Sequence, residues 1–402
     1  MLAPSHDPET PWQTELLNSL TSTQDLVENG LITIEEELAL TPIADQFKIR
    51  ITPYYSQLIA NTPNCPIRLQ AIPHLGEQDP LLPDWATQWS QKIYGRPTPW
   101  HSDPIGDIIH QGAPRLTHRY QHRAILHLSS LCALYCRFCF RKSHLNDDDR
   151  TLYEGSLDPA FQYLARNTEI TEVILTGGDP LSLTDASLER VFTQLEQIAH
   201  IKVLRIHSRM AVTLPIRFTA KLVRLLGQDR RFQIHLVSHF NHPKELTDLA
   251  KKTLKQLKKA GVSLLNQSVL MKGVNSSVEV LASLFQALYE QGVIPYYLHH
   301  PDWTPGTFQF RLPIQEGQRL MQALRGRLSG PALPDYILEI PQGQGKISLL
   351  DSRVIRQEGF HADGLIGGVY QVMSPQTRAQ SDRPYLYLDL AHMSTHTSAS
   401  DE

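Results

Sequence analysis

Three cysteines, Cys132, Cys136 and Cys139, form a C-x3-C-x2-C pattern in the segment SSLCALYCRFCFRKSH. Three thiolates can hold a [4Fe–4S] cluster in which one iron lacks a protein ligand, and S-adenosylmethionine (SAM) can chelate that iron through an amine and a carboxylate. A structural zinc site, with His118 or His144 as the fourth ligand, and buried free thiols are the alternatives. Because structural zinc sites favour paired C-x2-C spacings, the pattern favours the cluster.

Two glycines and an acid, Gly177, Gly178 and Asp179, follow the apolar segment EVILT. Adjacent glycines let a ligand approach the backbone closely and expose amide groups, which suits the methionine part of SAM. A simple turn is the alternative for such a pair. Its occurrence together with the cysteine pattern favours the SAM site.

A lysine, Lys346, follows Gly343 and Gly345 in the segment LEIPQGQGKISLL, and Arg119 lies in LTHRY. A lysine in a flexible, glycine-lined loop can form and exchange an imine with an aldehyde cofactor, and an arginine can neutralise a phosphate. Taken alone, each residue is more typical of a solvated surface charge.

A regular alternation of short apolar strands and helical segments begins at Arg123 and can position these motifs. Repeated β-α units predict a parallel sheet, and six units are two short of a closed eight-stranded barrel, so we expect an open, partial (β/α)6 barrel in the α/β class. The six predicted strands are 124–128, 172–175, 203–206, 232–237, 264–269 and 294–298.

The unusual polar segments gather at the ends of the predicted strands. The cysteine pattern, TGGDP, HSR, SHFNHP and HHPD follow strands, and NQS lies inside the fifth strand. Ligands of parallel β/α folds bind at the carboxyl ends of the strands, where the loops are free to vary. We therefore expect one composite active site at this end of the sheet.

The rest of the chain divides by composition. Residues 1–62 have helical apolar spacing and predict a helical appendage, whereas residues 63–122 are rich in proline and glycine and predict a segment that wraps the surface. The barrel is expected over residues 123–312, followed by a C-terminal segment, 313–375. Residues 376–402 lack the hydrophobicity that would offset the cost of ordering, which predicts a disordered tail.

Composition narrows the function classes. The chain has 402 residues, 41% of them hydrophobic, and a formal net charge of −3, so it can bury a large core but has no basic surface for nucleic acid or anionic lipid. No apolar run is long enough for a membrane span, and the N-terminus lacks a secretion signal, which predicts a cytoplasmic protein with a small-molecule substrate. In a reducing compartment, clustered cysteines indicate metal binding before disulfides.

In order and spacing, these segments resemble those of the lysine 2,3-aminomutases of the radical SAM superfamily. The similarity runs from ITPYYSQLI through PNCPIRLQ, LTHRY, the cysteines, LTGGDPL, SHFNHP, NQSVLMKGVN, PYYLHHPD and LRGRLSG to GQGK. The resemblance implies an isomerase that moves the α-amino group of lysine to the β carbon, and it implies three cofactors: a [4Fe–4S] cluster, SAM and pyridoxal 5'-phosphate (PLP).

By the same resemblance, Lys346 carries PLP as an imine, and Arg119 contacts its phosphate. The three cysteines hold the cluster, the segment from Gly177 to Asp179 lines SAM, and His239 and Gln267 lie near SAM and PLP. A reductant protein such as flavodoxin or ferredoxin is the implied electron donor, and a homo-oligomer is a further expectation.

For the substrate, the resemblance implies that Arg141 binds the carboxylate and that Asp302 and Glu339 receive the distant ammonium of lysine. Glu339 departs from the aspartate usual in free-lysine enzymes, so a lysine of translation elongation factor P, arginine and glutamate stay open as substrates, although two acids disfavour glutamate. The chain has no cysteine beyond Cys139, so we expect no structural zinc near the C-terminus. A metal-binding module without catalysis is the alternative of a different class.

Overall fold

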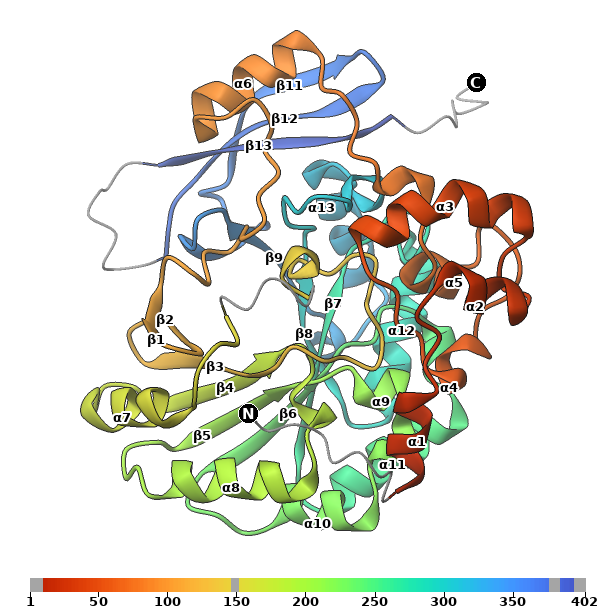
Figure 1. Ribbon diagram of the computed structural model, residues 1–402. Coiled ribbons are helices and arrows are strands. Elements are labelled where there is room, and N and C mark those ends of the chain that lie inside the picture. Colours follow the sequence, from red (N-terminus) through yellow and green to blue (C-terminus); the bar gives the residue numbers. More distant parts are fainter. Residues whose placement is uncertain (1–9, 146–151, 376–383, 394–402) are drawn as a thin grey trace.

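The computed structural model describes residues 10–145, 152–375 and 384–393, and a ten-stranded sheet with strands in sequence order forms its centre (Figure 1). All neighbours from β3 to β9 pair in parallel, whereas β1, β2 and β10 add antiparallel edges. The strands are β1 (Gln111–Ala113), β2 (Leu116–Tyr120), β3 (Arg123–Ser129), β4 (Glu172–Gly177), β5 (Val203–His207), β6 (Gln233–Ser238), β7 (Ser263–Val269), β8 (Ile294–His299), β9 (Asp335–Ile340) and β10 (Gly345–Ser348).

The predicted α/β class and open parallel sheet are confirmed. All six predicted strands are present as β3 to β8, and β9 adds a seventh parallel strand that the sequence reading assigned to the C-terminal segment. The outer edges, β1 and β10, do not pair with each other among the described strands, so the barrel stays open. Side-chain contacts bridge the gap: the amide of Lys346 donates to the hydroxyl of Tyr120 at 3.0 Å, and Arg119 of β2 pairs with Glu339 of β9.

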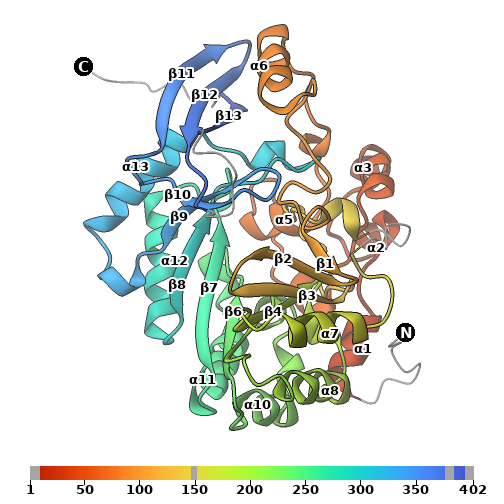
Figure 2. The same cartoon turned by 90° about the vertical axis from the view of Figure 1, so that its left-hand side faces the viewer.

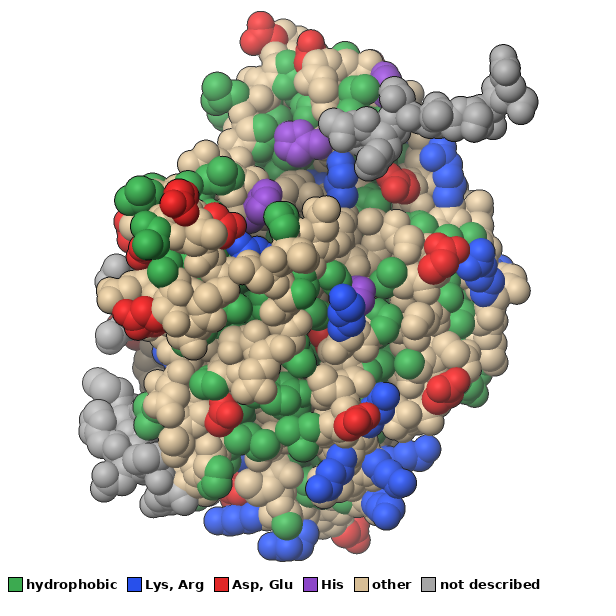
Figure 3. Space-filling model, turned by 90° about the vertical axis from the view of Figure 1, so that its right-hand side faces the viewer, with side chains coloured by type: hydrophobic (Ala, Val, Ile, Leu, Met, Phe, Trp, Pro, Cys, Tyr) green, Lys and Arg blue, Asp and Glu red, His purple; other side chains and the backbone are tan. Residues whose placement is uncertain are grey.

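Helices that connect the parallel strands cover the outer face of the sheet (Figure 2). They are α7 (Asp158–Arg166), α8 (Asp185–Glu196), α9 (Met210–Thr213), α10 (Ala220–Gly227), α11 (Asp248–Lys259), α12 (Val278–Glu290) and α13 (Ile314–Arg325). Helix α11 buries Leu254 and Leu257 against the sheet, while its lysines face solvent, and Figure 3 shows basic side chains gathered at the lower end of that face. None of the helices within the described ranges has the length and apolarity that a bilayer crossing requires.

The first five helices lie together on one side of the sheet (Figure 1): α1 (Pro11–Leu17), α2 (Thr23–Glu28), α3 (Ile34–Gln46), α4 (Pro53–Ser56) and α5 (Pro66–Ala71). Capping boxes at Ser22 and Thr33 satisfy the first amides of α2 and α3. Short 3-10 helices complete the chain: η1 (Leu75–Glu77), η2 (Lys142–His144), η3 (Pro180–Ser182), η4 (Pro215–Arg217), η5 (Pro243–Glu245), η6 (Phe308–Phe310) and η7 (Gly330–Ala332).

A second, three-stranded antiparallel sheet corrects two expectations. It consists of β11 (Ile355–Ala362), β12 (Leu365–Val372) and β13 (Tyr385–His392), and helix α6 (Asp84–Tyr94) packs against it (Figure 2). Segment 63–122 therefore does not merely wrap the surface, because it supplies α5, α6, β1 and β2. Tail 376–402 contains a buried strand, and its residues 376–383 and 394–402 lie outside the described residues.

The strand β13 is held by a buried charge as well as by its apolar side chains. Asp389 accepts from the amide of Ile314 at 2.7 Å and from Nη2 of Arg311 at 3.3 Å, and His300 lies at 3.3 Å from the same carboxylate. Arg311 also donates to the hydroxyl of Tyr387 at 2.8 Å. This set of contacts compensates an otherwise costly buried charge and fixes the C-terminal sheet on the barrel.

We expect Asp389→Ala to lower the free energy of unfolding by about 3–5 kcal/mol, because it leaves the buried Arg311 guanidinium uncompensated. Chemical denaturation monitored by circular dichroism measures the change. Asp351→Ala is the control, since Asp351 pairs with Arg353 at the surface, and this variant should change little. Equal effects of both substitutions would contradict the assignment.

Candidate active site

A cavity of about 670 Å³ opens at the carboxyl ends of the parallel strands. The residues to which the sequence assigned cluster, cofactor or substrate roles line it, whereas His118 and His144, the alternative zinc ligands, do not. The predicted convergence of the polar segments on one site is therefore what the structure shows. The lining residues with sequence-assigned roles are Arg119, Cys132, Cys136, Cys139, Arg141, Gly177, Gly178, Asp179, His239, Gln267, Asp302, Glu339 and Lys346.

The cysteines lie in the loop after β3, and the N-terminal segment fixes that loop. Leu134 forms a β-bridge with Ile51, and the amide of Arg137 donates to the carbonyl of Gln70 at 3.0 Å. Burial raises the pKa of all three thiols, that of Cys139 to about 11. The thiolate form therefore needs a positive partner, such as bound iron, to exist in this cavity.

The glycine pair lines the cavity and also lets the cysteine loop pack closely. A Cβ on Gly177 would lie 2.4 Å from the carbonyl oxygen of Ser129, and one on Gly178 would lie 2.7 Å from that of Leu131. The amides of Gly178 and Asp179 donate to these same two carbonyls, at 2.5 and 2.9 Å. Because they have no side chain, these glycines let the cysteine loop pack on the end of β4. The amides of Gly178 and Asp179 bind this loop and are not free to donate to SAM.

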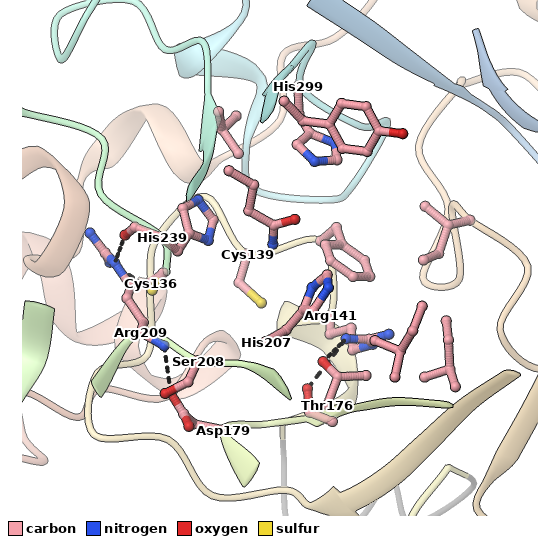
Figure 4. A pocket seen from close by; sticks show the side chains of 18 of the residues that line it. Cys136, Cys139, Arg141, Thr176, Asp179, His207, Ser208, Arg209, His239 and His299 are labelled. Atoms are coloured by element: carbon pink, nitrogen blue, oxygen red, sulfur yellow. Dashed lines mark hydrogen bonds between the residues drawn. The ribbon is translucent and has the colours of Figure 1, made fainter. Parts of the chain in front are cut away.

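Asp179 is buried, and its carboxylate organises the segment after β5. Its Oδ2 accepts from the hydroxyl of Ser208 at 3.0 Å and from the amide of Arg209 at 2.7 Å (Figure 4), and Oδ1 accepts from the amide of Leu181 at 3.0 Å. Burial raises the pKa of Asp179 to about 6 in spite of these donors. The side chain of Asp179 thus connects the segment after β4, which contacts the cysteine loop, to the segment after β5.

Lys346 is the second residue of strand β10 and does not lie in a flexible loop. It is paired directly across the antiparallel ladder with Glu339 of β9, and its Nζ donates to Oε2 of that carboxylate. Arg119 contacts the other oxygen of Glu339 at 2.8 Å, and its Nη1 donates to the carbonyl of Ile105 at 2.6 Å. Although burial alone would raise it, the pKa of Glu339 is lowered by the two cations.

Asp302 lies beside this group without a comparable ion pair among the described contacts. Burial, and then the charge of Glu339, raise the pKa of Asp302 to about 7. Its carboxyl is therefore poised to gain or lose a proton near neutral pH, and a cation entering the cavity would favour the ionised form.

Arg141 is buried and is already paired with an acid that the sequence reading missed. Its Nε and Nη2 donate to Oδ2 of Asp107 at 3.0 and 2.7 Å, and its Nη1 donates to the hydroxyl of Thr176 at 3.3 Å (Figure 4). Arg141 outweighs the effect of burial and lowers the pKa of Asp107 to about 2. The segment SDPIGDIIHQG holds two aspartates, Asp103 and Asp107, with no motif around them, and such a signal is too weak to single out Asp107.

Three histidines line the cavity with a buried Nε2 atom that has no protein partner: His207, His239 and His299. Burial lowers the pKa of each, that of His299 to about 3, so the rings are neutral. Neutral rings with an unpaired nitrogen can donate to or accept from a ligand. The segments HSR and HHPD signalled His207 and His299, although the sequence alone gave neither residue a role.

Comparison with known proteins identifies the family. Residues 126–285 match the model of the radical SAM superfamily. A putative L-lysine 2,3-aminomutase of Aquifex aeolicus is 35% identical over 88% of this chain and 92% of that protein. The chain belongs to the lysine 2,3-aminomutase family. An L-lysine 2,3-aminomutase of Fusobacterium nucleatum (36% identical; 86% and 77% covered) and a glutamate 2,3-aminomutase of Clostridioides difficile (33%; 86% and 76%) are also similar.

The family assigns this isomerase three cofactors, a [4Fe–4S] cluster, SAM and PLP, and the cavity residues fit them. Among the described residues, no three His, Cys, Asp or Glu side chains converge on a single metal ion. The three cysteines nevertheless face one cavity, which suits a cluster because its inorganic core lies between the thiolates. For PLP, Lys346 offers an amine, and Arg119 keeps a buried Nε without a partner, which a phosphate can satisfy.

We expect Cys136→Ala to prevent stable cluster assembly, because a thiolate ligand is lost. Iron and sulfide content after anaerobic reconstitution measures the effect. Cys65→Ala is the matched control. Cys65 is also a free cysteine, but it lies outside the cavity lining, so this variant should keep the iron content of the wild type. Full iron content in Cys136→Ala would contradict the assignment.

Proposed function

We propose that this enzyme converts L-lysine to β-lysine by moving the α-amino group to the β carbon. The proposal rests mainly on the charges that line one cavity. Asp302 and Glu339 lie beside Lys346, and a buried arginine, Arg141, lines the same cavity. A substrate with a carboxylate at one end and an ammonium at the other is complementary to this arrangement.

The pairing of Lys346 with Glu339 explains how an ammonium site arises. Once Lys346 holds PLP, its nitrogen is no longer the free ammonium that donates to the Glu339 carboxylate in this structure. Asp302 and Glu339 then form an acidic pocket in which the distant ammonium of lysine replaces the ammonium of Lys346. Glutamate would place a third carboxylate there, so it is disfavoured despite the similarity to a glutamate 2,3-aminomutase.

The residues of the chain bind and orient the reactants. When bound, the cluster and SAM supply one-electron radical chemistry, and PLP supplies the carrier for the migrating nitrogen. Arg141 holds the substrate carboxylate while Asp302 and Glu339 hold the distant ammonium, which fixes the α and β carbons between them. Glu339 Oε2 accepts a hydrogen bond from Nζ of Lys346 and so orients the amine, which must lose a proton before it becomes nucleophilic.

Two partners complete the proposal. A reductant protein such as flavodoxin or ferredoxin supplies the electron that the radical chemistry requires. Assembly into a homo-oligomer stays a prediction.

A lysine that is attached to a protein fits the proposed site less well than free lysine, since its carboxylate would not be free to pair with Arg141.

PLP should attach to Lys346, because this amine faces the cavity opposite Glu339. Borohydride reduction of the reconstituted enzyme, followed by peptide mapping, should place the pyridoxyl group on Lys346. Lys346→Ala should lose the PLP absorbance while retaining cluster iron. A label on Lys272, whose Nζ donates to the carbonyl of His392 outside the cavity lining, would overturn the assignment.

For substrate choice, we expect Asp302→Asn to lower kcat/KM for lysine roughly 30-fold or more, because loss of one partner of a buried ammonium costs about 2–5 kcal/mol. Wild-type kcat/KM should fall as the pH drops below about 7, since protonation of Asp302 removes the same charge. For Asp302→Asn, kcat/KM should not change with pH over that range.

Turnover of lysine, arginine and glutamate by both forms provides the measurement. Asp335→Asn is the control, because Asp335 is exposed at the opposite end of β9, and its profile should follow the wild type. Preference for glutamate in the wild type, or unchanged lysine turnover in Asp302→Asn, would refute the proposed pocket.

A further inference from the structure

Arg209, in the HSR segment after β5, is buried and reaches the cysteine loop (Figure 4). Its Nη1 donates to Sγ of Cys136 at 2.9 Å. Its Nη2 donates to Oε1 of Glu245 and to Oε1 of Gln70, each at 2.6 Å. The guanidinium therefore joins the barrel, helix α5 and the cysteine loop, and its Nη1 is directed at a sulfur.

The orientation of Arg209 is fixed by groups that are themselves held in place. Its Nε donates to the carbonyl of His239 at 3.2 Å. Glu245 accepts from the hydroxyl of Tyr55 at 2.8 Å and from the amide of Asn241 at 2.6 Å, so its carboxylate cannot turn away. Such a hydrogen-bond network holds the Arg209 donor in one orientation. The network does not have to rearrange when the charge on the Cys136 sulfur changes.

We propose that Arg209 is a positioning residue that raises the reduction potential of the cluster through its hydrogen bond to the Cys136 thiolate. This inference rests on the proposed ligation by the three cysteines. Hydrogen bonds to the sulfurs and nearby charge are principal determinants of cluster potentials, and a cation stabilises the more negative, reduced state. The step is a one-electron transfer in which the reductant is oxidised and the cluster reduced.

This arrangement has a functional consequence. A higher potential lets a weaker physiological reductant load the cluster, whereas the driving force for passing the electron to SAM becomes smaller. Glu245 partly offsets the charge of Arg209, so the pair sets the balance between these two requirements. The same buried pair fastens the N-terminal helices to the barrel through Tyr55 and Gln70.

The test is an EPR-monitored redox titration with dithionite of anaerobically reconstituted holoenzyme in the absence of SAM. In Arg209→Gln, the midpoint potential should become more negative by at least about 59 mV. For a one-electron couple, this shift corresponds to a tenfold change in the equilibrium constant of reduction. Arg209→Lys keeps the charge but not the planar fork, so its shift should be smaller. Glu245→Gln should shift the potential in the positive direction, because the offsetting charge is removed.

Arg217→Gln is the matched control. Arg217 is also a buried arginine. It donates to Asp185 at 2.7 Å and to the carbonyls of Leu181 and Leu183, and none of these hydrogen bonds reaches a cysteine. The Arg217→Gln substitution should lower the free energy of unfolding but leave the midpoint potential of the cluster unchanged. If Arg209→Gln does not retain a cluster, Arg209→Lys and Glu245→Gln carry the test.

Two outcomes overturn the inference: wild-type potentials in the Arg209 and Glu245 variants, or an equal shift in Arg217→Gln. Such results would show that Arg209 only stabilises the fold. A wild-type protein without a cluster would instead refute the cysteine assignment, and absent lysine turnover with shifted potentials would refute only the proposed substrate.

Discussion

The placement of the cysteine loop depends on one buried carboxylate, that of Glu77. It accepts from Nε and Nη2 of Arg137 at 2.8 and 2.5 Å and from Nζ of Lys142 at 2.6 Å. These two cations flank Cys139, so a shift of the loop would leave a buried charge without its partner, at a cost of about 3–5 kcal/mol. A loop outside the regular sheet thereby acquires one well-defined position, which a cluster with three fixed ligands requires.

The same constraint, that a buried charge needs a partner, organises the rest of the cavity. Arg141 pairs with Asp107, Arg119 and Lys346 share Glu339, and Arg209 pairs with Glu245. A charged group of the substrate or of a cofactor can therefore replace one member of such an ion pair when it binds. No charge is then left without a partner in the interior. Asp302 lacks such a pair in the described contacts, and its raised pKa is the consequence.

The open sheet reconciles a rigid scaffold with a large cavity. Seven parallel strands bring polar residues from separate β-α units to one edge, while the unpaired outer strands leave room for ligands instead of closing a packed core. Lys346 of β10 and Tyr120 of β2 meet across the gap, so the two edges of the sheet approach without pairing. Ile105, in the segment before β1, also lines the cavity.

The sequence by itself determined the six central strands, the cysteine pattern and the glycine-lysine segment, because periodicity and motif spacing are local properties of a chain. Only the tertiary structure showed that Asp107 holds Arg141, that Glu77 anchors the cysteine loop and that Arg209 reaches Cys136. It also decided that the amides beside the glycine pair bind the protein itself and that β13 is ordered. Each of these depends on which distant segments share a buried surface, and the partner of a buried charge is selected by desolvation in the folded chain, which no local pattern records.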